Sequence, residues 1–268
     1  MSLVSTLRTV RILASQRPTT PPRSIASPSR VHRERRGRVP VTWIDRDRAA
    51  DGIIVHLHGG DHLYGAGRAD WAWLEEVARR SGAAAVMIHH RLAPRFPFPA
   101  GLHDVLAVIE DLSEDVTLRP GHWVLSGEGS GAALALAAAQ TLAEQGATLP
   151  AALLVESPWV DLTREQHDLD QLRTAAELYT ASVPREDPRI SPALADLAGL
   201  PPVLIVAGEH DELRQDAQDL ATALIRSGTP RELVSVTAGR SPAVRGEGPA
   251  AQEARRHQIR AIREVLAP

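Results

Sequence analysis

The feature that most constrains this chain is a glycine-rich turn between a short apolar strand and an alanine- and leucine-rich helix. The segment reads Val124-Leu125-Ser126-Gly127-Glu128-Gly129-Ser130-Gly131-Ala132. An apolar run that meets Gly-x-x-x-Gly and then continues as a strong helix former predicts a sharp strand–turn–helix elbow. The middle residue of such an elbow is exposed at the C-terminal edge of a sheet. Here that residue is Gly129, which has no side chain to present.

The composition excludes several classes of function. The 268 residues are 43% hydrophobic with a formal net charge of −3, which fits one globular domain with a sizeable core and gives no reason to expect nucleic acid as a partner. No apolar run is long enough to span a bilayer. Cysteine is absent, which excludes disulfides, a thiol nucleophile and a zinc–thiolate site. We expect no cofactor.

Residues 1–38 differ from the rest of the chain. They are rich in arginine and contain a single acid, Glu34. A transit peptide or a polyanion-binding arm would have such a composition. The favoured interpretation is a basic tail with a short helix, at about 2–16, that folds over a domain formed by residues 39–268. Because no apolar core with a small-residue cleavage site is present, we expect a cytoplasmic location.

Apolar segments of strand length alternate with amphipathic segments of helix length. Besides the elbow strand, strands are expected at 39–44, 52–58, 83–89, 151–156, 201–207 and 232–236. Besides the elbow helix, helices are expected at 71–81, 102–112, 216–227 and 252–266. This alternation predicts an α/β fold, with a mostly parallel sheet covered by helices on both faces and 39–44 as an edge strand. The polar segment at about 163–190 is the natural place for a lid inserted into the single domain.

Five ordered motifs indicate a family. They are Leu57-His58-Gly59-Gly60, Arg91-Leu92-Ala93-Pro94 with Pro97-Phe98-Pro99-Ala100, Ser157-Pro158-Trp159-Val160-Asp161-Leu162, Ile190-Ser191-Pro192 and Leu200-Pro201-Pro202. In this order they resemble the hormone-sensitive-lipase-like carboxylesterases of the alpha/beta-hydrolase superfamily, from about residue 55 to 233. The resemblance implies an alpha/beta-hydrolase fold with a small cap, here shortened, and an ancestry in ester hydrolysis. Members of the family often form dimers through the last strand and helix, so a homodimer is one of the alternatives for this chain.

The same resemblance assigns the oxyanion donors. The backbone N–H groups of Gly59 and Gly60 would point at a developing oxyanion, with the N–H of Ser130, at the start of the elbow helix, as the third donor. Asp61 stands where the family usually has a third glycine. A carboxylate beside the oxyanion hole would repel an oxyanion unless its side chain points away.

The resemblance also locates the catalytic triad, and two of its three members are missing. The acid position is Asp211, which is retained. The nucleophile position is Gly129. Counting from the last strand, the position of the base falls on Ser241, and the next histidine is His257, inside the predicted final helix. Joint loss of nucleophile and base indicates that the hydrolytic machinery has been abandoned.

Two catalytic alternatives remain open. If the elbow slipped by one residue, Ser130 would become the nucleophile of a weak carboxylesterase or lipase, although Glu128 would then replace the leading glycine of the turn. The series His56-x-His58-x-x-Asp61-His62 resembles a metal-binding cluster with one residue too many. The resemblance explains His58 as part of the oxyanion loop instead, and we expect no metal.

The favoured hypothesis is a repurposed or binding site above Gly129. It would bind or transform a small, partly apolar molecule without an acyl-enzyme, either as a lyase or cyclase or as a non-catalytic binder. Asp211 and Glu128 are the candidate acid and base, and the expected pocket residues are His58, Asp61, His62 and His210. A structural role is the alternative for all of them. Asp211, lacking its histidine, would then cap the next helix or pair with an arginine.

Overall fold

The computed structural model describes residues 12–164 and 170–266 of the chain. Its centre is a sheet of eight strands in the order β1-β2-β4-β3-β5-β6-β7-β8. The strands are β1 Val31–Arg36, β2 Val39–Ile44, β3 Ile53–Leu57, β4 Ala84–Ile88, β5 Trp123–Glu128, β6 Ala152–Glu156, β7 Val203–Gly208 and β8 Arg231–Val236. The β1–β2 and β2–β4 pairs are antiparallel, and the other neighbours are parallel.

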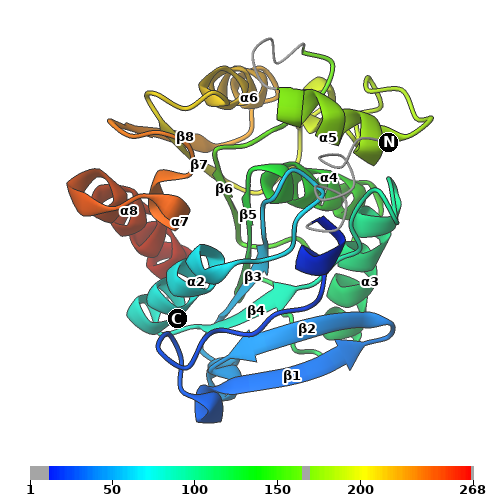
Figure 1. Cartoon of the computed structure of the whole chain (residues 1–268). Helices are drawn as coiled ribbons and strands as arrows, with labels where there is room; N and C mark the ends of the chain where they lie inside the picture. Colours follow the sequence, from blue (N-terminus) through cyan, green and yellow to red (C-terminus); the bar gives the residue numbers. More distant parts are fainter. Residues whose placement is uncertain (1–11, 165–169, 267–268) are drawn as a thin grey trace.

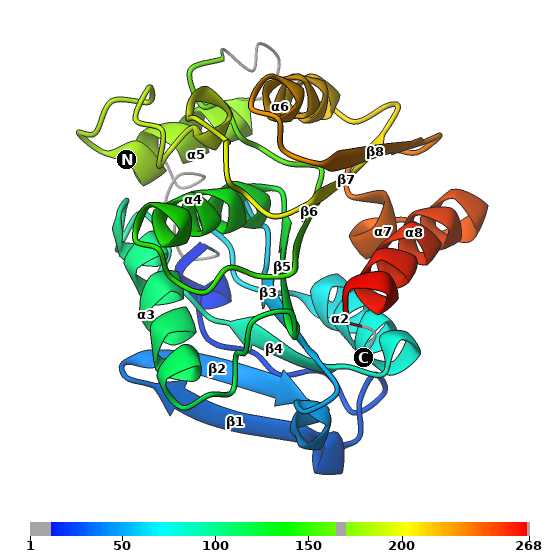
Figure 2. The same ribbon diagram turned by 180° about the vertical axis from the view of Figure 1, so that it is seen from behind.

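Helices cover both faces of this sheet (Figures 1 and 2). One face packs against α3 (Ala100–Glu114), α4 (Ser130–Glu144) and α6 (Arg214–Arg226). The other packs against α2 (Arg68–Ser81) and α8 (Gly248–Leu266). The remaining elements are α5 Asp170–Thr180, α7 Pro242–Arg245, η1 Pro28–Arg30, η2 Arg46–Arg48 and η3 Pro192–Leu194. The predicted α/β fold with a mostly parallel sheet is confirmed.

The burial of the central strands explains why their apolar sequence predicts them. Every residue of β3, β4, β5, β6 and β7 is buried, as expected for parallel strands covered on both faces. Loops that follow the C-terminal ends of β3, β5, β6, β7 and β8 carry the candidate site. Residues far apart in the sequence therefore meet at one edge of the sheet.

The N-terminal region departs from prediction. Residues 31–36, expected in the tail, form strand β1, so 39–44 is an inner strand and not the edge. The charged, largely exposed sequence of β1 suits an edge strand, whose free backbone groups are protected by charge from pairing with other chains. Of the helix expected at about 2–16, residues 12–15 are helical and residues 1–11 lie outside the described part.

The lid segment predicted at about 163–190 contains helix α5, while residues 165–169 lie outside the described part. In the ranges 12–164 and 170–266, none of the helices combines the length and the apolar character that crossing a membrane requires.

Candidate functional site

The elbow between β5 and α4 has the geometry that the sequence predicts. Gly129 caps α4 with φ 56° and ψ −116°, a conformation that glycine adopts far more readily than other residues. A Cβ at Gly127 would overlap the carbonyl of Gly131, and one at Gly131 would overlap the carbonyl of Leu57. Strand, turn and helix therefore pack too closely for any larger residue at the two outer positions.

Gly129 is different, because a Cβ there would meet the end of a flexible side chain and not backbone. Among the described residues, one heavy atom lies within 4 Å of the point that a Cβ would occupy, and it is Nη2 of Arg240, at 3.1 Å. Sequence analysis did not select Arg240. The available signal was a basic residue in the loop after the last strand, directly before the position assigned to the base.

Arg240 is held at the elbow by Asp61. Its Nη2 donates to Oδ1 of Asp61 at 2.9 Å, and its Nη1 lies 3.6 Å from Glu212. Burial alone would lower the pKa of Arg240. The negative charges of Asp61 and Glu128 have the larger effect, so the pKa of Arg240 is raised above its ordinary value. The other carboxylate oxygen of Asp61 accepts from Gln171 of α5 at 2.8 Å. Asp61 therefore joins the loop after β3 to both helix α5 and the loop after β8.

The two glycines of the oxyanion loop are required by close contacts. A Cβ at Gly59 would overlap the carboxylate of Glu128, and one at Gly60, whose φ is 109°, would overlap the carbonyl of Tyr64. Neither N–H group forms a hydrogen bond with a described residue. Both therefore remain as donors for an oxygen of a ligand.

Ser130 is the first residue of α4 and not the apex of the turn. Its hydroxyl oxygen accepts a hydrogen bond from the backbone N–H of His62 at 3.0 Å, and its side chain is buried. The slipped elbow considered above is thus not the geometry of this structure. Ser130 instead links the helix to the oxyanion loop.

Asp211 lies in the loop after β7, where the resemblance puts the acid of the triad. One carboxylate oxygen accepts from the hydroxyl of Ser157, and the other accepts from the N–H of Leu213 at 2.8 Å. Burial raises the pKa of Asp211, although these two donors oppose the rise. Ser157 in turn accepts from the N–H of Ser241 at 2.8 Å. The hydroxyl of Ser241 is buried and donates to Glu128, the residue before Gly129, and not to Asp211.

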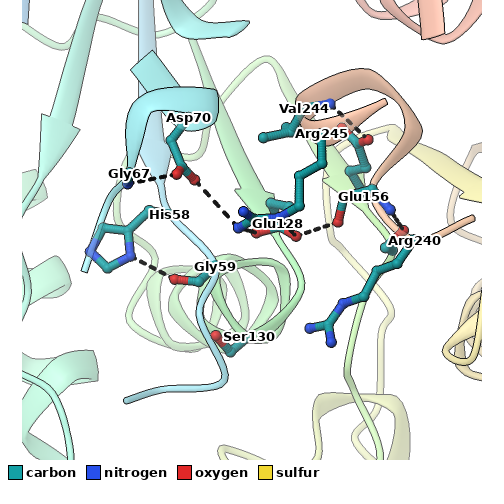
Figure 3. A network of polar contacts seen from close by, with 12 residues as sticks. His58, Gly59, Gly67, Asp70, Glu128, Ser130, Glu156, Arg240, Val244 and Arg245 are labelled. Atoms are coloured by element: carbon teal, nitrogen blue, oxygen red, sulfur yellow. Dashed lines mark hydrogen bonds and ion pairs between the residues drawn. The ribbon is translucent and has the colours of Figure 1, made fainter. Parts of the chain in front are cut away.

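A buried ion pair lies beneath the elbow (Figure 3). Nε and Nη2 of Arg245 donate to the two oxygens of Glu128 at 3.2 and 3.1 Å. Burial alone would raise the pKa of Glu128, but Arg245 outweighs it and holds that pKa below the ordinary range. Asp70 lies 4.0 Å from Arg245, and burial raises its pKa. Glu128 is therefore a charged structural group, held by a partner that the sequence did not point to.

A second buried carboxylate fixes the segment that follows Ser241. Glu156 accepts from the N–H groups of Ala243 and Val244 in α7 and from Nε2 of Gln258. Oε1 of Gln258 accepts from Trp73 at 2.7 Å. Complete burial raises the pKa of Glu156 to about 7. This network positions the loop that carries Arg240 against the end of β6.

The histidines selected from the sequence do not form one cluster. His58 bonds the carbonyl of Gly59 at 2.8 Å and stacks on His90, while His56 bonds Ser126 at 2.9 Å. His62 stacks on Tyr179 with ring centroids 3.5 Å apart. His210 is exposed, so its side chain is not part of the buried cluster around Gly129. Within the described ranges, no group of three or more possible metal ligands is present.

Comparison with known proteins decides the family. A model described as the alpha/beta hydrolase fold matches residues 54–239. The chain belongs to the hormone-sensitive-lipase-like esterase family of alpha/beta hydrolases. An acetyl-hydrolase of Streptomyces hygroscopicus is 36% identical over 206 residues, which is 72% of this chain and 69% of the relative. An esterase of Acinetobacter venetianus is 30% identical, over 65% of this chain and 62% of the relative.

Solved structures of this alpha/beta-hydrolase family match almost the whole chain. A bacterial esterase of the hormone-sensitive lipase family superposes with a TM-score of 0.82 at 26% identity and covers 100% of both chains. A hormone-sensitive lipase homologue from a metagenome library gives a TM-score of 0.84 at 26% identity, covering 97% of this chain and 93% of its own.

Proposed function

We propose that this alpha/beta hydrolase binds or transforms a small, partly apolar molecule without forming an acyl-enzyme. The observation that carries the proposal is the elbow, where Gly129 offers no nucleophile and the nearest side chain is a guanidinium. Acyl transfer by this fold needs a hydroxyl or thiol at the apex and a base within hydrogen-bond reach. An arginine cannot serve as that base, because it stays protonated.

The remaining triad position supports the same conclusion. Both oxygens of Asp211 are engaged, by the Ser157 hydroxyl and by the Leu213 N–H. Ser157 thus occupies a hydrogen-bonding position that a triad histidine would need. Of the two acid–base candidates, Asp211 suits proton transfer better, because its pKa is raised while Glu128 is neutralised by Arg245.

Stabilisation of a negatively charged oxygen is what the site retains. The N–H groups of Gly59 and Gly60, unbonded among the described residues, directly precede Asp61, which pairs with Arg240. Such donors are equally suited to a bound anion and to an enolate formed by a lyase or cyclase. They require neither an acyl-enzyme nor a histidine.

A second candidate is ester hydrolysis through Ser130, and the relatives favour it. Proteins that match most of this chain are named acetyl-hydrolase and esterase. For this candidate, Ser130 would have to leave its hydrogen bond with the His62 N–H and reach the apex of the turn.

Hydrolysis of p-nitrophenyl acetate and butyrate by the wild-type chain and by Ser130→Ala separates the candidates, with an active esterase as positive control. We expect both chains to hydrolyse no more ester than buffer does. Hydrolysis by the wild type that disappears in Ser130→Ala would favour the second candidate and contradict the proposal.

A further inference from the structure

The position that a side chain on Gly129 would begin to fill has Arg240 as its close neighbour from elsewhere in the chain. Nη2 of Arg240 is the one described heavy atom within 4 Å of the position that a side chain would begin to fill. Arg240 is mostly buried, with 21% of its side chain exposed. A guanidinium is therefore directed at the place where the fold would otherwise hold its nucleophile. In Figure 3 it extends toward the end of the site at which Ser130 lies.

Several N–H donors near this point have no hydrogen-bond partner among the described residues. Nη2 is the one atom of Arg240 that donates a hydrogen bond to a described residue, so most N–H donors of this guanidinium have no partner there. The N–H groups of Gly59 and Gly60 are also unbonded among the described residues. No nitrogen of Arg240 is among the described side-chain atoms that are both buried and unpartnered, so its unbonded N–H groups reach solvent and are accessible to a ligand that supplies acceptor lone pairs.

The carboxylates nearby are already engaged. Asp61 divides its two oxygens between Arg240 and Gln171. Glu212 lies 3.6 Å from Arg240 but is 40% exposed, so solvent and salt screen its charge. Glu128 is neutralised by Arg245. Because Asp61 accepts from a single N–H of Arg240, the other N–H groups of the guanidinium stay available for another anion.

Building on the proposed function, we propose that Arg240, Gly59 and Gly60 form a binding site for the carboxylate of a small organic acid. A carboxylate offers two oxygens, one for the fork of the guanidinium and one for the two backbone N–H groups. An ester, amide or alcohol offers one neutral acceptor and no charge to pair with Arg240. The site therefore selects acids over their neutral counterparts, and Arg240 determines that selection.

Thermal unfolding with butyrate, butyramide and 1-butanol as probes tests this inference. The three have the same chain length and differ in charge, and sodium chloride at equal ionic strength is the control for salt. We expect butyrate at millimolar concentration to raise the unfolding temperature in a saturable way, while the two neutral probes and sodium chloride do not. Equal shifts with butyramide, or no shift with butyrate, would overturn the inference.

Three variants assign the effect to the guanidinium. Arg240→Gln is expected to weaken butyrate binding by about tenfold or more, since the charge-assisted hydrogen bonds to one carboxylate oxygen are lost. Arg226→Gln, at an exposed position at the end of α6, is the matched control and is expected to bind butyrate like the wild type. Asp61→Asn removes the competing carboxylate, so it is expected to tighten butyrate binding.

A purely structural role for Arg240 predicts something else. Arg240→Gln would then lower the unfolding temperature without changing the increment caused by butyrate, and Asp61→Asn would not tighten binding. Either result contradicts the carboxylate site. The proposed function fails separately, by Ser130-dependent ester hydrolysis, so the two failures are distinguishable.

Discussion

Nη2 of Arg240 lies 3.1 Å from the point at which a Cβ on Gly129 would lie. In a serine hydrolase of this fold, that point is the beginning of the nucleophile. Here the closest side chain carries a permanent positive charge and is anchored by Asp61 at 2.9 Å. On the proposed function, the fold of an esterase family is combined with a site that holds an anion.

The elbow is expected to tolerate a methyl group at its apex but not at its flanks. Gly129→Ala introduces a Cβ at φ 56°, which costs about 1–2 kcal/mol of unfolding free energy, and Arg240 can yield to it. Gly127→Ala is the comparison, because its Cβ would overlap backbone, and we expect no stable fold. Urea unfolding measures both. Equal damage from the two substitutions would contradict this account of the elbow.

Ser130 is expected to act through its hydrogen bond with the His62 N–H. Ser130→Ala leaves that buried donor without its acceptor and should lower the free energy of unfolding by about 1 kcal/mol. Ser113→Ala is the matched control, since Ser113 bonds only the carbonyl of Ile109 within its own helix. We expect the control to leave stability nearly unchanged in the same urea titration. A stability of Ser130→Ala equal to that of the wild type would remove the structural role assigned to this hydroxyl.

The ion pair between Glu128 and Arg245 is expected to be costly to break. Glu128→Gln leaves Arg245 partly buried without its partner, which should cost about 3 kcal/mol. This is the lower end for a buried pair, because 43% of the Arg245 side chain is exposed. Glu76→Gln breaks two surface pairs, with Arg80 and with Arg255, and should cost about 1 kcal/mol or less. Similar losses from the two variants in a chemical unfolding experiment would show that the network beneath the elbow is unimportant.

Acid is expected to destabilise the fold through buried neutral histidines. Burial lowers the pKa of His62 to about 3, and the same holds for His56 and His89. A base with a lowered pKa in the folded state contributes stability above its unfolded pKa of 6.5 and loses it as the pH falls toward 3. Between about pH 7 and about pH 5, each such histidine should remove about 2 kcal/mol.

His62→Phe tests this pH dependence, because phenylalanine can keep the stack on Tyr179 without titrating. We expect the variant to lose less stability than the wild type between about pH 7 and about pH 5, by about 2 kcal/mol. His103→Gln, at an exposed position, is the control and should follow the wild-type curve. Parallel curves for His62→Phe and the wild type would show that His62 does not contribute to acid lability.

The amino-acid sequence was sufficient to predict the central strands of the sheet and the elbow. Apolar runs mark β3, β5 and β7 because parallel strands buried on both faces need such side chains throughout. It was insufficient to predict β1, because exposed arginines and a histidine replace the alternation of apolar and polar residues that marks a strand. Pairing with β2 supplies the missing information there, and pairing is a tertiary property.

The candidate site was predictable only in part. Gly59, Gly60 and Gly129 follow from motif positions next to strands, and the backbone fixes where they lie. Arg240 could not be selected, because in an irregular loop the sequence does not tell which side chains point inward. Here both neighbours do, Arg240 beside Gly129 and Ser241 on Glu128. Ser157 was missed as the partner of Asp211, since only the fold brings the ends of β6 and β7 together.

The central claim is that no activated serine stands at this elbow, and intact-mass analysis after exposure to a fluorophosphonate tests it most directly. This reagent phosphonylates activated serines, so an active esterase in the same reaction is the positive control. We predict that the folded chain keeps its unmodified mass while the control is labelled. A single adduct that maps to Ser130 would contradict the account and indicate that the chain acts as a serine esterase.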